Sequence, residues 1–170
     1  NSLLKVIEEP QSEIYIFFLT NDQEQILQTI RSRTQIFQFK KHVESLRNQL
    51  EQAGLVKNKA RLLAEFSQSQ AEAEKLTNQT SFWTLVEESE RFYSWLDAGK
   101  KESYLQVAKL ASLADDKEKQ DQVFRILEVL AGQEIQKNAA RTILQNLLEA
   151  RKMWKANVSF QNSLEYLVLQ

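Results

Sequence analysis

The spacing of hydrophobic positions changes near residue 41. Before that point the run "IYIFFL" at 14–19 is continuous and rich in β-branched and aromatic residues, which is typical of a strand buried on both faces of a parallel sheet. "QIFQF" at 35–39 predicts a second short strand. Because two strands cannot bury both faces of a sheet, we expect the closing part of a larger α/β domain, and hence a fragment of a longer protein.

Helical patterns flank these two strands. The apolar positions within 3–7 have helical spacing until Pro10, which ends the segment. A second apolar face over 26–30 predicts a helix that Asn21 or Asp22 can cap at its N-terminus. The first forty residues therefore predict the order helix, strand, helix, strand.

After residue 41 the apolar positions recur every three or four residues. Short helices are predicted over 42–78, with Gly54 ending the first of them. The polar stretch "NQTS" with Thr77 before it, at 77–81, predicts a linker. Longer helices follow to the C-terminus, and their wide apolar stripes predict a bundle. We expect one face of the first short helix to carry Val43, Leu46 and Leu50, and Asp115 and Asp116 can cap the third of the longer helices. The residues expected to face inward on the second longer helix are Tyr104, Val107, Ala108 and Ala111, and those on the fourth are Ile135, Ala139, Ile143, Leu147 and Trp154.

Composition supports a mainly α-helical protein and excludes several kinds of chemistry. Only three glycines and one proline occur in 170 residues, which suits helices and leaves no glycine-rich phosphate loop. Cysteine is absent, which excludes disulfides, thiolate zinc sites and cysteine nucleophiles. A net charge of −1 gives no sign of independent binding to nucleic acid or membrane, and the longest apolar run is too short to cross a bilayer.

Arg31 and Arg33 are the charged residues that raise a functional question, because they bracket Ser32 where one pattern ends and another begins. From local physics alone they are cations near a helix C-terminus, where the helix dipole favours them. Thr20 and Asn21 follow the first apolar run, at the strand end where α/β sheets expose ligand-binding groups.

Other conspicuous residues are better explained by ordinary structure. Glu8 and Glu9 have no partner base or metal ligand nearby, and the single histidine, His42, cannot make a zinc site alone. The aromatic residues within 82–96 follow an apolar stripe among acidic residues, so we interpret them as core or subunit packing. Short basic clusters are interpreted as solvated faces: Lys57, Lys59 and Arg61, and Lys100 with Lys101.

Three N-terminal motifs resemble the clamp-loader branch of the AAA+ ATPases. They are "NSLLKVIEEP", "YIFFLTN" and "ILQTIRSRTQIFQF", in the family's order and spacing, with Thr34 where the family usually has cysteine. The C-terminal "NVSFQNSLEYLVL" is similar to the last collar helix of bacterial clamp-loader subunits. The resemblance implies the closing part of an AAA+ α/β domain over 1–40, a small helical lid over 41–78 and a helical-bundle collar over 79–170.

The resemblance also implies a function. The chain would be a subunit of the clamp loader of bacterial DNA polymerase III, in a cytoplasmic hetero-oligomer with motor (tau/gamma) and delta subunits. It would act through that assembly on primed DNA and the sliding clamp, with no role at a membrane. It would not be an enzyme by itself and would hold neither cofactor nor metal, because ATP would be bound by the neighbouring motor subunits.

Within the family, Ser32 and Arg33 match the Ser-Arg motif at the subunit interface. The resemblance therefore implies that Arg33 is an arginine finger in trans, directed at the γ-phosphate on a neighbouring subunit, with Arg31 as a supporting charge. Thr20 and Asn21 match the sensor position. The alternative for Asn21 is that it only caps the helix that follows it.

Two alternatives stay open. The first is an ATP-hydrolysing motor subunit, although Ala71 stands where the lid arginine of hydrolysing relatives is expected when Ala73 is aligned with the family's alanine. That departure favours a stator-like, non-hydrolysing subunit, and the upstream sequence would decide between the two. The second alternative is a helical scaffold unrelated to replication, which binding to clamp-loader partners would exclude.

Overall fold

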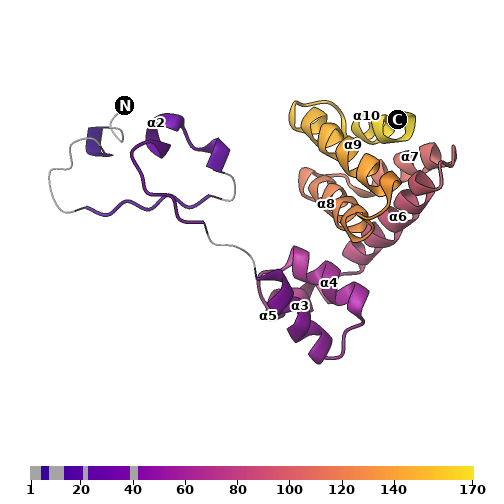
Figure 1. The fold of residues 1–170 in the computed structure, drawn as a ribbon, viewed down its shortest axis with the longest axis horizontal. Coiled ribbons are helices and arrows are strands. Elements are labelled where there is room, and N and C mark those ends of the chain that lie inside the picture. The colour runs from indigo at the N-terminus through magenta and orange to yellow at the C-terminus, as the bar shows by residue number, and fades with distance from the viewer. Residues whose placement is uncertain (1–4, 8–13, 21–22, 39–41) are drawn as a thin grey trace. The chain divides into compact units, whose positions relative to one another are not determined.

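The computed structural model describes residues 5–7, 14–20, 23–38 and 42–170, and its chain forms two compact units, Asn1–Lys41 and His42–Gln170. The described residues are mainly α-helical, as predicted. Figure 1 shows the helices, whose bounds are as follows. The elements are η1 (Gln23–Gln25, a 3-10 helix), α2 (Gln28–Arg31), α3 (Val43–Gln52), α4 (Lys57–Phe66), α5 (Gln70–Thr77), α6 (Thr80–Asp97), α7 (Ser103–Leu113), α8 (Lys117–Gln133), α9 (Asn138–Lys155) and α10 (Phe160–Leu169).

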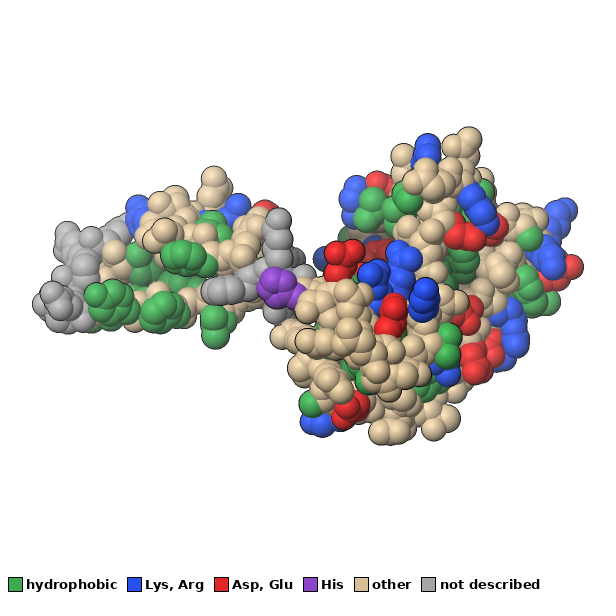
Figure 2. Space-filling view, turned by 60° about the horizontal axis from the view of Figure 1, so that its bottom comes forward, with side chains coloured by type: hydrophobic (Ala, Val, Ile, Leu, Met, Phe, Trp, Pro, Cys, Tyr) green, Lys and Arg blue, Asp and Glu red, His purple; other side chains and the backbone are tan. Residues whose placement is uncertain are grey.

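The two strands predicted in the N-terminal unit are not formed in its described residues. Residues 14–20 and 35–38 have no regular secondary structure, and the predicted α/β architecture is not seen there. Tyr15, Phe17 and Leu19 are 84%, 82% and 95% exposed, and Figure 2 shows hydrophobic side chains gathered on the surface of this unit. A strand needs a neighbouring backbone for its hydrogen bonds and covering helices for its apolar side chains. Among the described residues, the run 14–19 has neither a pairing strand nor covering helices, so it does not form the strand that its composition favours.

The predicted helix over 26–30 is shorter than expected. Leu27 is the N-cap of α2 with ψ of 134°, so the α-helix begins only at Gln28. Leu27 is exposed, whereas Ile26 and Ile30 are half-buried. The predicted cap residues 21–22 lie outside the described residues.

The first helices of the C-terminal unit follow the predicted signals closely. Leu46 and Leu50 are buried on α3, and Gly54, with φ of +95°, lies directly after that helix as expected of a C-terminal glycine. Ser69 caps α5 by accepting a hydrogen bond from the backbone N–H of Glu72 at 3.3 Å. Gly54 thus marks the C-terminal end of α3 as predicted, and Ser69 marks the N-terminal end of α5.

The connection between α5 and α6 is shorter than the linker predicted at 77–81. Only Asn78 and Gln79 separate α5 from α6, because Thr80 already belongs to the long helix. The indole Nε1 of Trp83 donates to the carbonyl of Thr77 at 2.9 Å across this connection. The division of this unit into a lid and a collar stays a prediction.

Helices α6 to α10 pack as a bundle, with neighbouring contacts between α6 and α7, α6 and α8, α8 and α9, and α9 and α10. Asp116 caps α8 as predicted, accepting from the backbone N–H of Lys119 at 2.8 Å. Of the inward positions predicted on α7, Val107 is buried and Ala111 is half-buried, whereas Tyr104 and Ala108 are exposed, so those two predictions are wrong. On α9, Leu147 is buried and Ile143 and Trp154 are half-buried as predicted. Ala139 and Ile135, which precedes α9, are exposed, so their predicted inward positions are wrong.

A buried carboxylate, Glu88, joins α6 to α7. Its oxygens accept hydrogen bonds from Gln106 and, at 2.6 Å, from the ammonium of Lys109, and Arg91 lies 3.4 Å away. Burial raises the pKa of Glu88, but the hydrogen bonds from Lys109 and Gln106 and the charge of Arg91 lower it further, so the net pKa lies below the ordinary value of 4.5. The carboxylate is therefore more stable as an anion in the folded protein than in the unfolded chain.

The Glu88→Gln variant is expected to be less stable than the wild type by about 1–3 kcal/mol at neutral pH, because Lys109 loses a charged partner. Since the folded pKa is lowered, this stabilisation is present above the unfolded pKa and is lost as the pH falls through the folded pKa. Urea unfolding of the wild type and the variant should be measured at neutral pH and at successively lower pH below 4.5. The difference between their free energies of unfolding should become smaller as the pH falls. Glu87→Gln is the control, the same change at an exposed position of α6. Equal stability of the Glu88 variant and the wild type at neutral pH would contradict this account.

Candidate functional site

The Ser32–Arg33 turn lies directly after α2. Ser32 is the C-cap residue, and its backbone N–H donates to the carbonyl of Gln28 at 2.9 Å. The hydroxyl of Ser32 donates to the carbonyl of Thr29 at 3.2 Å, and Nη1 of Arg33 donates to the same carbonyl at 2.9 Å. Nη1 also lies 3.4 Å from the hydroxyl oxygen of Ser32. Ser32 and Arg33, the two residues of the predicted motif, therefore donate hydrogen bonds to the same carbonyl oxygen, that of Thr29.

These contacts agree with the simplest interpretation of the arginine. The last carbonyls of a helix have no partner within the helix and carry the negative end of its dipole, so a guanidinium is stabilising there. Arg33 is exposed and its planar fork of donors is at the surface of the unit. The role of Arg33 at a neighbour's phosphate stays a prediction.

Arg31 has a different partner. Its Nη1 lies 3.1 Å from a carboxylate oxygen of Glu24, and an open groove of about 480 Å³ is lined by residues 24–28 and Arg31. Thr34, at the position where the family has cysteine, donates its hydroxyl to the carbonyl of Ile30 at 3.0 Å. Thr34 therefore adds a hydrogen bond to the helix end and leaves the local charge unchanged.

The other predicted site positions are described only in part. Thr20 is exposed at the end of the segment 14–20, and Asn21 lies outside the described residues. On α5, Ala71 is exposed whereas Ala73 is fully buried. The alignment of Ala73 with the family's alanine, and with it the missing lid arginine at Ala71, stays a prediction.

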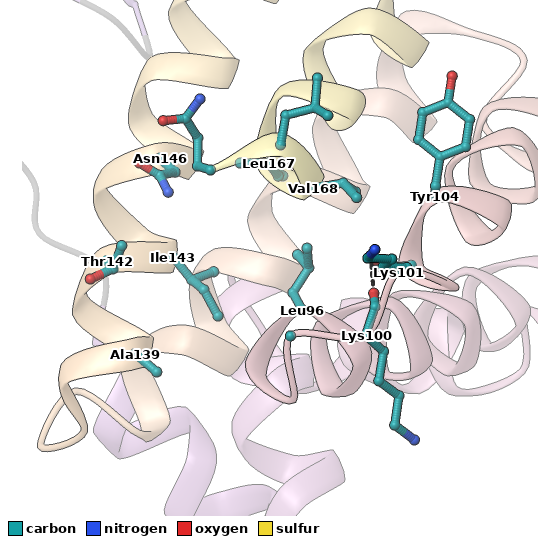
Figure 3. A pocket seen from close by; sticks show the side chains of 14 residues that line it. Leu96, Lys100, Lys101, Tyr104, Ala139, Thr142, Ile143, Asn146, Leu167 and Val168 are labelled. Atoms are coloured by element: carbon teal, nitrogen blue, oxygen red, sulfur yellow. Dashed lines mark hydrogen bonds between the residues drawn. The ribbon is translucent and has the colours of Figure 1, made fainter.

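A second feature is an open groove of about 660 Å³ within the C-terminal unit, between the ends of α6, α7, α9 and α10. Figure 3 shows Leu96 and Ile143 on opposite sides of it, with Leu167 between them. Lys100 and Lys101 are in its lining, and among the described lining residues there is neither Asp nor Glu. The groove is therefore apolar inside and positively charged at one edge.

The described part of the chain offers no alternative site of a familiar kind. In residues 5–7, 14–20, 23–38 and 42–170, no group of three or more His, Cys, Asp or Glu side chains could hold a metal ion. Of the helices in those same ranges, none has both the length and the apolar character required of a membrane span.

Comparison with known proteins relates the chain to the subunits of DNA polymerase III. Residues 1–43 match the family model described as "DNA polymerase III, delta subunit". The chain is also 26% identical to "DNA polymerase III subunit delta'" of Bacillus subtilis (strain 168) over 198 aligned residues, which cover 99% of this chain and 60% of the relative. These two matches confirm the resemblance to a clamp-loader subunit of bacterial DNA polymerase III, and the match across nearly the whole chain is to a delta-prime subunit.

The chain thus spans about 60% of the length of this curated relative. No solved structure matches the chain.

Proposed function

We propose that the chain acts as a delta-prime-type subunit of a bacterial clamp loader. In this role it is a non-catalytic, cytoplasmic component of the DNA polymerase III holoenzyme and helps to load the sliding clamp onto primed DNA. The observation that carries the proposal is the similarity to the Bacillus subtilis delta-prime subunit across 99% of the chain. In the proposed assembly, α3 to α5 serve as the lid and α6 to α10 as the collar that joins the other subunits.

The proposed site is the Ser32–Arg33 turn. The guanidinium of Arg33 leaves Thr29 and binds oxygens of the γ-phosphate on the neighbouring motor subunit, where it stabilises charge on the transferred phosphoryl group. Two observations support this role: Arg33 is exposed, and Ser32 fixes the turn by donating to the same helix end. In this proposal the nucleotide is bound by the neighbouring motor subunit.

An assembly measurement tests the proposal. The chain is mixed with motor and delta subunits and separated by size-exclusion chromatography, with the motor and delta subunits alone as the reference. The proposal predicts that the chain elutes in a larger complex together with both partners. Elution of the chain at its own size in every mixture would leave the helical scaffold as the better explanation.

The Leu169→Glu variant is expected to weaken this assembly. Leu169 is 76% exposed and lines the apolar groove, where we propose that a neighbouring collar helix packs. A carboxylate at this position replaces apolar contacts and must be desolvated when the helix packs, so the complex should dissociate at higher protein concentration than with the wild type. Gln145→Glu adds the same charge at an exposed position of α9 outside the groove lining and serves as the control. Equal effects of the two variants would exclude the groove as the contact.

A further inference from the structure

The connection between α6 and α7 places two lysines at one edge of the groove in the C-terminal unit. Gly99, with φ of +61°, reverses the chain after α6, and the backbone N–H of Lys100 donates to the carbonyl of Trp95 at 2.9 Å. The hydroxyl of Ser103 donates to the carbonyl of Lys100 at 2.7 Å. These hydrogen bonds fix the backbone of the turn, so Lys100 and Lys101 project from a defined position.

The charges of these two lysines have no carboxylate partner within the unit. In residues 42–170, all of which are described, neither Lys100 nor Lys101 forms an ion pair, and both are exposed. The lysines of this range that do form one are Lys109, Lys119, Lys137 and Lys152. Asp97 and Glu102 are close to the pair in sequence, but neither lines the groove. Two ammonium groups are therefore available to the carboxylates of a ligand.

The opposite edge of the groove is polar but neutral. Figure 3 shows Thr142 and Asn146 of α9 across the groove from the two lysines. Between the two edges the lining includes the half-buried side chains of Leu96, Ile143 and Val168. A ligand that complements this arrangement has an apolar stripe with acidic side chains along one flank only.

Exposed apolar side chains on α7 and α10 favour an elongated ligand over a small molecule. Tyr104 and Leu105 of α7 are 50% and 73% exposed, and Leu169 of α10 is 76% exposed. Because α7 also buries Val107 and Leu110, it carries apolar residues on more than one face. That pattern is typical of a helix that is covered on more than one side. An amphipathic helix can cover such a surface by placing its apolar residues at helical spacing into the groove.

We infer that the groove binds an amphipathic helix whose acidic side chains face Lys100 and Lys101. The apolar stripe of that helix packs against the groove interior, and the two lysines select its charge and its orientation. That the helix belongs to a neighbouring subunit rests on the proposed function. Its acidic flank follows from the groove of this chain alone.

The binding of two synthetic helices tests the inference. Both peptides carry fluorescein, share one apolar stripe and have about 18 residues, so that an isolated helix can form. One flank of the stripe carries glutamates in the first peptide and lysines in the second. Fluorescence anisotropy with the whole chain should show about tenfold tighter binding of the glutamate peptide, the size expected of two exposed ion pairs. Added salt should reduce this preference, because exposed charges are screened.

Charge reversal at the groove identifies the groups responsible for the preference. The double variant Lys100→Glu with Lys101→Glu should bind the lysine peptide more tightly than the glutamate peptide. Lys117→Glu with Lys155→Glu is the matched control, because it makes the same change of charge at two exposed positions outside the groove lining. This control should keep the wild-type preference. Leu169→Ala should weaken the binding of both peptides and leave the preference between them unchanged.

Circular dichroism establishes that each variant is folded. If the charge-reversed variant does not fold, Lys100→Gln with Lys101→Gln decides the question, since removal of both charges should abolish the preference.

Four results would overturn the inference: binding of neither peptide, equal binding of the two, an unchanged preference when the groove lysines are replaced, or a reversed preference in the control. None of these measurements requires partner subunits or ATP. A chain that shows the preference but elutes alone in the assembly measurement would refute only the proposed function. A chain that joins the assembly but lacks the preference would refute only the inference.

Discussion

Replacing Arg33 by alanine is expected to lower the ATPase rate of an assembled clamp loader by about 10³-fold or more, which is the effect of removing an arginine finger. This corresponds to a loss of about 4 kcal/mol of transition-state stabilisation. The physical reason is that a guanidinium binds two phosphate oxygens at once and keeps its charge at any accessible pH. The rate is measured as steady-state hydrolysis at saturating ATP. The assembly used has one active ATP site, that of the motor subunit next to this chain.

Arg31→Ala is the matched control for this experiment. It removes the same charge two residues away, and its recorded partner is Glu24 on the same unit. We expect a much smaller change in rate than with Arg33→Ala. Size-exclusion chromatography of each variant assembly separates a loss of catalysis from a loss of binding. An Arg33→Ala complex that is intact and hydrolyses ATP at the wild-type rate would refute the role of Arg33.

The second large effect is expected from Phe124→Ala in the bundle. Phe124 is fully buried, and its ring centroid lies 5.6 Å from those of both Trp154 and Phe160. Truncation removes contacts between α8, α9 and α10 and leaves a cavity, so we expect a loss of about 3–5 kcal/mol in the free energy of unfolding. Thermal unfolding should show a melting temperature lower by roughly 10 °C.

The control for the core variant is Leu148→Ala on α9. Leu148 is about half exposed, so its truncation removes little buried surface and should change the free energy of unfolding by only about 0.5 kcal/mol. Similar losses in the free energy of unfolding for Phe124→Ala and Leu148→Ala would show that Phe124 does not lie in a tightly packed core.

Helix ends were the features most accessible from the sequence. Gly54 after α3 and Asp116 at the start of α8 act through atoms within a few residues of themselves, so their effect can be predicted locally. The apolar spacing likewise identified the buried Leu46 and Leu50 of α3, because one helical face suffices to indicate them.

The wrong predictions concern strands and buried faces. Both depend on packing or pairing partners that are distant in sequence or absent from the segment. The run 14–19 has the composition of a strand, but a strand forms only against a neighbouring strand, and the pattern contains no information on that pairing. Tyr104 and Val107 were both predicted to face inward on α7, yet Val107 is buried and Tyr104 is exposed. Periodicity identifies a helix more reliably than it identifies which of two adjacent stripes is buried.

The charged contacts of the C-terminal unit were missed for the same reason. Arg125 stands between buried Phe124 and Ile126, and a cation within an apolar stretch is a signal that it has a specific partner. Its partner, a backbone carbonyl near the end of α4, lies 60 residues earlier, so only the structure identifies it. Glu88 and Lys109 are separated by 21 residues and were equally invisible to local analysis. In contrast, the interest of Arg33 came from the resemblance of its motif, since its local contacts are those of any helix end.

The most direct test of the central claim is whether residue 33 lies at a neighbouring subunit's ATP. Arg33→Cys and Arg31→Cys each introduce a unique thiol into the cysteine-free chain, which is assembled with motor and delta subunits whose own exposed cysteines have been removed. An ATP analogue with a thiol-reactive group on its γ-phosphate is then added, and cross-linked products are identified by mass spectrometry. The account predicts cross-linking at position 33, strongly favoured over position 31, and only when the motor subunits are present. Equal cross-linking at both positions, or none at position 33 in the intact assembly, would contradict it.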